Sequence, residues 1–248
     1  MSKRPSDAQI RSSYLEQAQR SQAHRFLAAV LGTETDQPVN SLVTPDFTCE
    51  LNGRSAPLDL RGLPELTAER RQNIELADIE FADADPLLPL ISHVKVVSCG
   101  ELEPTEEKGS FSVPHRLLSL KHRWHALGES PTKTAPPYTQ IISKNFVMDW
   151  GTGSVQSHAE LEDWLTNSAS SMAAARHDIA AFEWSAIDDS RFEATFEFDW
   201  NGISQTGKAM QARSRHIWQV LDDGKEPFAR IDRMDIQFLV PFHVVDEA

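Results

Sequence analysis

A repeat with an offset near 98 residues constrains the fold more than any other feature of the sequence, because a duplicated unit fixes how a chain divides. The segment 39–50, VNSLVTPDFTCE, aligns with 138–149, YTQIISKNFVMD. Upstream, HRF at 24–26 aligns with HRW at 122–124. The order of helix and strand signals is shared by both halves of the 248 residues, so we expect two copies of one α+β unit.

The region before the second copy's first strand has two possible interpretations. Apolar residues at 117, 120, 124 and 127 lie on one helical face, and Ser112 before Pro114 is typical of a helix start. In the alternative register, 122–124 aligns with HIW at 216–218, and 108–127 becomes a strand of the first copy. We favour the helix, because the spacing and the start signal agree.

The rest of the second copy indicates one helix and a meander of strands. Ser157-His-Ala-Glu160 has the capping-box pattern of a helix start. Residues 191–200 alternate strictly between apolar and polar side chains, which predicts a half-buried strand, and Asn201-Gly202 is a hairpin signal. Further strands are expected at 146–150, 179–185, 208–220 and 229–240.

The first copy is shorter, and we place the domain boundary so that residues 1–108 form a degenerate copy and residues 109–248 a complete one. We expect a helix at 7–31, a short helix and strand within 39–53, and a helix at 62–74. Two strands, 76–83 and 91–101, should follow. We therefore expect this copy to lack the last strands of the unit.

This order of elements resembles the nuclear-transport-factor-2-like superfamily, and more narrowly the SnoaL-like branch that includes ketosteroid isomerase. The resemblance covers about residues 112 to 242, and it rests on FVMDWGTG, the helix after SHAEL, GKAMQARSRHIWQVLDDG and ARIDRMDIQF. It implies an α+β, cystatin-like fold in which a curved antiparallel sheet wraps around helices to make a cone. Such a cone commonly holds a small apolar molecule.

The resemblance places Asp149 where the isomerase branch has its proton-transferring carboxylate. Along the strand 208–220, His216 and Trp218 share one face and Arg213 and Arg215 the other, and the apolar Trp218 favours the His216 face as the inner one. We therefore predict an Asp149–His216 catalytic pair, with the alternative that Asp149 only binds a loop backbone. The predicted ligand-binding residues are Trp150, His158, Trp184, Phe196 and Trp218.

Several classes of partner and cofactor are not expected. Acidic residues outnumber basic ones 37 to 24, and the net charge of −13 disfavours nucleic acid and anionic membranes. Neither a nucleotide-binding glycine motif nor a third ligand beside His122 and His125 is apparent, so we expect no cofactor and no metal. We see no secretory signal or membrane-spanning run, and we expect a cytoplasmic protein.

Two functions follow from these observations. The first is a protein that binds a small apolar or amphipathic molecule, with isomerase, dehydratase or hydrolase activity that needs no cofactor. The second is a non-catalytic scaffold, in which the outer face of the sheet joins copies of the chain into a homo-oligomer.

Overall fold

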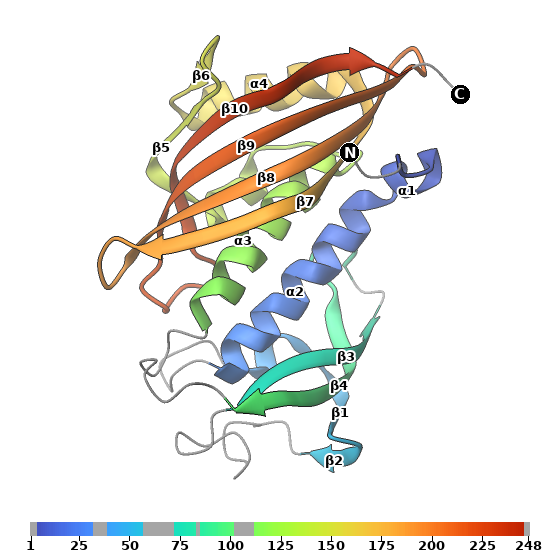
Figure 1. Ribbon diagram of the computed structural model, residues 1–248, viewed down its shortest axis with the longest axis vertical. Helices are drawn as coiled ribbons and strands as arrows, with labels where there is room; N and C mark the ends of the chain where they lie inside the picture. Colours follow the sequence, from blue (N-terminus) through green and yellow to red (C-terminus); the bar gives the residue numbers. More distant parts are fainter. Residues whose placement is uncertain (1–3, 32–38, 57–71, 83–84, 102–111, 246–248) are drawn as a thin grey trace. The chain divides into compact units, whose positions relative to one another are not determined.

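The computed structural model describes residues 4–31, 39–56, 72–82, 85–101 and 112–245 (Figure 1). The chain forms two compact units, one of residues 1–17 with 120–248 and the other of residues 18–119. Helices α2 (Ser13–Leu31) and α3 (Ser112–Glu129) each contribute to both units. The domain boundary predicted at residue 108 lies outside the described residues and stays a prediction.

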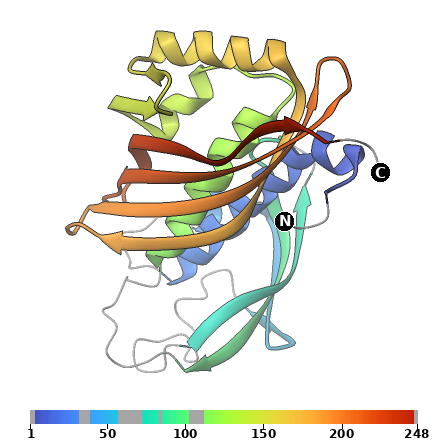
Figure 2. The ribbon, with the colours of Figure 1, turned by 45° about the horizontal axis from the view of Figure 1, so that its top comes forward.

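The six-stranded unit, residues 1–17 with 120–248, has a curved sheet with strand order β6-β5-β10-β9-β8-β7. Figure 2 shows α3 and α4 on the same side of this sheet. All neighbouring strands are antiparallel except β5 and β10, which are parallel. The elements that follow α3 are η4 (Pro136–Gln140), β5 (Ile142–Asp149), β6 (Ser154–Val155), α4 (His158–Ser171), β7 (Met172–Ala186), β8 (Arg191–Ser204), β9 (Ala209–Leu221) and β10 (Arg230–Val244).

The helical interpretation of the region before η4 is confirmed, and the alternative strand is wrong. Helix α3 buries Leu117, Leu120, Trp124 and Leu127, each at most 5% exposed, as their spacing predicts. At the start of α4, the Ser157 hydroxyl accepts a hydrogen bond from the backbone N–H of Glu160, as expected. The Glu160 carboxylate, however, accepts from the backbone N–H of Gln156.

The predicted strands occur, but several of their limits differ from expectation, and two of these differences matter for the site. Strand β8 does not turn at Asn201-Gly202, because Gly202 stays in register with Ala175 of β7 and Met210 of β9. The chain turns instead at Gly207, whose φ of +81° favours glycine. Strand β7 begins at Met172, seven residues before the predicted start at 179, and this difference places His177 inside the sheet.

The four-stranded unit, residues 18–119, has the strand order β2-β1-β4-β3. Its β1 and β4 are parallel, as β5 and β10 are, so its four strands match β6-β5-β10-β9 in order and direction. Its elements after α2 are η1 (Val39–Ser41), β1 (Val43–Leu51), β2 (Arg54–Ala56), β3 (Gln72–Ala82) and β4 (Leu90–Glu101).

This match corrects the view that the first copy lacks its last strands. Because β4 and β3 correspond to β10 and β9, the strands without a counterpart in the described part of the unit are β7 and β8. Most of the helix predicted at 62–74 lies outside the described residues, and residues 72–74 belong to β3. The helix predicted at 7–31 is two helices, α1 (Asp7–Arg11) and α2, which meet at Ser12.

The contacts between α2 and α3 repeat with the same offset of 98 residues. Ser21 and Ser119 are equivalent positions, and each hydroxyl donates to the backbone carbonyl of the other, at 2.9 and 3.0 Å. His24 contacts His115, and His122 contacts Gln17. These two contacts are equivalent, because His122 lies 98 residues after His24 and Gln17 lies 98 residues before His115. This is the pattern expected of a helix that occurs twice in one chain.

Candidate functional site

A cavity of about 780 Å³ lies in the six-stranded unit, between α3, α4 and the concave face of the sheet. Its wall is mainly aromatic and aliphatic, and its charged and imidazole side chains come from α3, the loop after α3, β7 and β9. The wall includes four tryptophans, Trp124, Trp150, Trp164 and Trp200, three methionines, Met148, Met172 and Met210, and three histidines, His125, His177 and His216. A cavity of this size accommodates a small organic molecule.

Of the predicted site residues, Trp150 and His216 line the cavity. Phe196 and Trp218 are fully buried and pack with their rings tilted, at 5.0 Å between ring centroids, so they form packed core rather than wall. Trp184 is 37% exposed against Phe192, and His158 is exposed at the start of α4. The expectation that the last four line the cavity is therefore wrong.

The predicted Asp149–His216 pair does not form. In β5, Met148 is buried and lines the cavity, so its neighbour Asp149 points to the opposite face of the strand. The Asp149 carboxylate accepts a hydrogen bond of 2.7 Å from the backbone N–H of Gly151. This is the loop-binding role that the sequence left as the alternative, and it removes Asp149 from the cavity.

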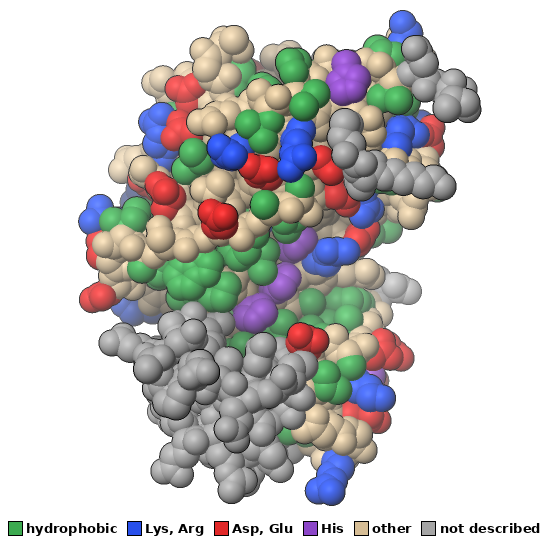
Figure 3. Space-filling model, in the orientation of Figure 1, with side chains coloured by type: hydrophobic (Ala, Val, Ile, Leu, Met, Phe, Trp, Pro, Cys, Tyr) green, Lys and Arg blue, Asp and Glu red, His purple; other side chains and the backbone are tan. Residues whose placement is uncertain are grey.

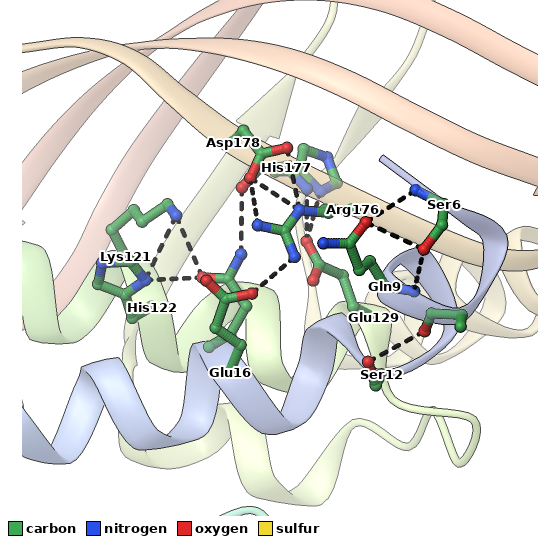
Figure 4. Close-up of polar contacts among 12 residues, drawn as sticks. Ser6, Gln9, Ser12, Glu16, Lys121, His122, Glu129, Arg176, His177 and Asp178 are labelled. Carbon is green, nitrogen blue, oxygen red and sulfur yellow. Dashed lines mark hydrogen bonds and ion pairs between the residues drawn. The ribbon is translucent and has the colours of Figure 1, made fainter. Parts of the chain in front are cut away.

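The cavity contains a different pair of an acidic residue and a histidine, formed by Glu129 and His177 (Figure 4). Glu129 is the last residue of α3, and one of its oxygens, Oε1, accepts from both the backbone N–H and the ring Nδ1–H of His177, at 2.9 and 2.8 Å. The Glu129 side chain is 1% exposed and the His177 side chain 21%. Because the carboxylate occupies Nδ1, the free nitrogen of His177 is Nε2, with an available lone pair.

Two further histidines of the wall stay uncharged. Burial is the main reason that the pKa values of His125 and His216 lie well below the ordinary value, and the electrostatic influence of the neighbouring His177 and Lys121 lowers these pKa values further. His125 donates from Nδ1 to the backbone carbonyl of Lys121 at 2.9 Å, so its Nε2 is an acceptor. These rings are neutral polar groups over the ordinary pH range.

Several buried polar atoms beside the cavity have no hydrogen-bond partner: Nε2 of His125, Oε2 of Glu129, the hydroxyl of Tyr138 and Nδ1 of His216. Leaving such an atom unsatisfied costs about 1 to 3 kcal/mol. Four of them around one cavity are more than packing alone requires, and this concentration is typical of a functional site. No group of three metal-ligating side chains occurs in the part of the chain that the structure describes.

The N-terminal segment holds the strand that presents His177. Arg176 pairs with Glu16 at 2.6 Å and with Asp178 at 2.7 Å, and the side-chain amide of Gln17 donates to the backbone carbonyl of His177 at 3.1 Å. Figure 4 shows Glu16, Arg176 and Asp178 beside the histidine. We call Glu16, Gln17, Arg176 and Asp178 the β7 clamp. It fixes the backbone of His177, while Glu129 fixes the ring.

No protein-family model and no curated protein matches the sequence. Solved structures of low identity do match. A nuclear-transport-factor-2-like superfamily protein of Salmonella enterica has a TM-score of 0.46 and 10% identity, over 55% of this chain and 98% of that one. An uncharacterised protein with a cystatin-like fold from Caulobacter vibrioides has a TM-score of 0.42 and 11% identity, over 52% and 90%.

A hexachlorocyclohexane dehydrochlorinase of Novosphingobium barchaimii has a TM-score of 0.40 and 8% identity, over 46% of this chain and 78% of that one. These are likenesses of fold. The six-stranded unit itself has the predicted α+β, cystatin-like architecture, with a curved sheet wrapped around helices.

No helix in the described part of the chain is both long enough and apolar enough to cross a membrane.

Proposed function

We propose that this protein binds a small, largely apolar molecule in the cavity and catalyses a proton transfer on it without a cofactor, as an isomerase or a dehydratase. The observation that carries the proposal is the Glu129–His177 pair on the cavity wall. A neutral imidazole held in one tautomer by a carboxylate is a general base, and such a base contributes about 10²- to 10⁴-fold to a rate.

In the proposed step, Nε2 of His177 removes a proton from a carbon of the ligand, and the electrons of the C–H bond form a new double bond to the neighbouring carbon. In an isomerisation, the π bond that this neighbour already shares with a third carbon breaks, its electrons move to the third carbon, and the imidazolium returns the proton there. In a dehydration, the C–O bond on the neighbouring carbon breaks, and the proton leaves with the departing hydroxide as water. The Glu129 carboxylate stabilises the imidazolium in both cases, and the apolar wall keeps bulk water from the bound ligand.

The test starts with native mass spectrometry of the purified protein, which identifies a ligand retained in the cavity. With that molecule or its precursor as substrate, Glu129→Gln should lower kcat about 100-fold or more, because the amide cannot stabilise a charged His177 ring. The matched control is Glu183→Gln, an exposed carboxylate on the same strand as His177. Turnover that is unchanged in Glu129→Gln contradicts the proposal.

A second readout needs no substrate. Nitrogen-15 NMR of the histidine rings reports which nitrogen bears the proton. We expect His177 to be protonated at Nδ1 in the wild-type protein, because Glu129 accepts that proton at 2.8 Å. A ring protonated at Nε2 would place the lone pair on the wrong nitrogen and refute the assigned role.

The alternative, a scaffold that assembles through the outer face of the sheet, stays a prediction. This outer face is polar: Glu197 pairs with Arg213 and Arg215 at 2.9 and 2.6 Å, and Arg233 pairs with Asp235 at 2.6 Å. Figure 3 shows acidic and basic side chains interspersed on it. Sedimentation over a range of concentrations tests this alternative, since a scaffold must associate.

A further inference from the structure

Lys133 is the only lysine or arginine among the described residues that line the cavity. It lies in the loop after α3, between Glu129 and Tyr138, which line the cavity as well. No ion pair joins Lys133 to another described residue. Its side chain is half-buried, and burial lowers the pKa of its ammonium group, with the Glu129 charge opposing that shift.

Among the described residues, the charge of Lys133 is therefore poorly compensated. Glu129, the acidic group whose charge acts on Lys133, already uses Oε1 for two hydrogen bonds to His177. A partly desolvated ammonium group gains from a neighbouring negative charge much more than a solvated one does, because the local dielectric constant is low. An anionic group on a ligand would supply that charge.

The rest of the wall suits a flat aromatic body. Trp150, Trp164 and Trp200 line the cavity and contribute aromatic surface to its wall. Phe238 and Phe242 also line it; their rings are in contact at 5.0 Å and remain 42% and 47% exposed. An aromatic ligand that reached them would cover this apolar surface.

We infer that the ligand is a planar aromatic molecule with an ionised acidic group, oriented with its anion at Lys133 and its rings against the tryptophans. This inference rests on the proposed function for the location of the site, and it adds the chemical class of the ligand and its orientation.

The experiment compares two probes of the same shape and different charge, 2-naphthoate and 2-naphthylmethanol. Quenching of tryptophan fluorescence measures their binding, because four tryptophans line the cavity. The buffer contains about 0.15 M salt, which screens the net charge of −13 beyond about 8 Å. The proteins are the wild type, Lys133→Met and the control Lys144→Met, an exposed lysine of β5 outside the cavity.

We expect the wild type and Lys144→Met to bind 2-naphthoate about tenfold more tightly than 2-naphthylmethanol, and Lys133→Met to lose this preference while still binding the alcohol. Retained binding of the alcohol shows that the variant is folded. Equal affinity of the wild type for both probes, or a preference that survives in Lys133→Met, overturns the inference. Those results leave the proton-transfer proposal intact, since that proposal fails only if Glu129→Gln leaves turnover unchanged.

Discussion

Replacement of Arg176 by methionine tests whether the β7 clamp stabilises the strand of the candidate base. The guanidinium group is 15% exposed and makes contacts of 2.6 Å with Glu16 and of 2.7 to 3.0 Å with Asp178. Methionine fills much of the same volume but removes the Arg176 cation from both carboxylates. Losing a buried ion-pair partner costs about 3 to 5 kcal/mol.

The expected loss of stability is smaller than this range, because water can hydrate the two carboxylates once Arg176 is replaced. Glu16 is 40% and Asp178 35% exposed, so we expect Arg176→Met to lower the free energy of unfolding by about 2 kcal/mol. For a protein of this length, 1 kcal/mol changes Tm by about 2 to 4 °C, which predicts a decrease of about 4 to 8 °C. Thermal unfolding followed by circular dichroism measures it.

Arg215→Met is the matched control, because it removes the same side chain from an exposed pair on β9. Arg215 is 42% exposed, and its partner Glu197 keeps a second cation, Arg213. Exposed pairs contribute about 0.2 to 1 kcal/mol, so this Tm should fall by at most about 3 °C. If Tm decreases by the same amount in the two variants, the clamp does not stabilise β7 and the reasoning is refuted.

Two further predictions concern packing and pH. Gly202→Ala should lower the free energy of unfolding by about 1 to 3 kcal/mol and change the tryptophan fluorescence. The reason is that the new Cβ would lie 2.2 Å from Trp200 and 2.7 Å from Met172, both in the cavity wall. An unchanged melting temperature and emission spectrum would contradict this prediction. Burial lowers the pKa of His115 to about 4, while the unfolded chain titrates near the ordinary value of 6.5. The free energy of unfolding therefore includes a contribution from neutral His115 that is present above about pH 6.5 and is lost as the pH falls toward about 4. At pH 5 the loss is about 2 kcal/mol. Urea unfolding at about pH 7.5 and at about pH 5 measures it, and the free energy of unfolding should fall less between these two pH values in His115→Leu than in the wild type. An equal loss in both proteins would show that His115 is not the group responsible.

Strong periodicity made most elements of the six-stranded unit predictable. The helical spacing of α3 and the strict alternation of β8 each correspond to one buried face, and both elements form. The first part of β7 had no such signal, because residues 172–178, MAAARHD, contain three consecutive alanines and then charged groups. The sequence therefore predicts a strand that begins at 179, and this start excludes His177 from the sheet.

The position of Asp149 was readable from the sequence. In β5, the apolar Phe146 and Met148 alternate with Val147 and Asp149, and Trp150 directly after the strand continues the apolar series. This pattern alone assigns Val147 and Asp149 to the opposite face. The predicted Asp149–His216 pair rests on the family resemblance and disagrees with this alternation. Glu129 could not be found in this way, since a carboxylate at the end of a helix is ordinary, and its role depends on a strand 48 residues later in the chain.

The Glu129–His177 pair has no counterpart among the described residues of the four-stranded unit. His177 lies on β7 and Trp200 on β8, and these are the strands without counterparts among the described residues of the four-stranded unit. The residue equivalent to Glu129 at the offset of 98 is Leu31, which has no acidic group. A histidine at the position of His177 would therefore have neither a strand to hold it nor a carboxylate to orient it. If the proposed chemistry is correct, it belongs to the six-stranded unit alone, and substitutions in the core of the four-stranded unit should change stability without changing the pH dependence of turnover.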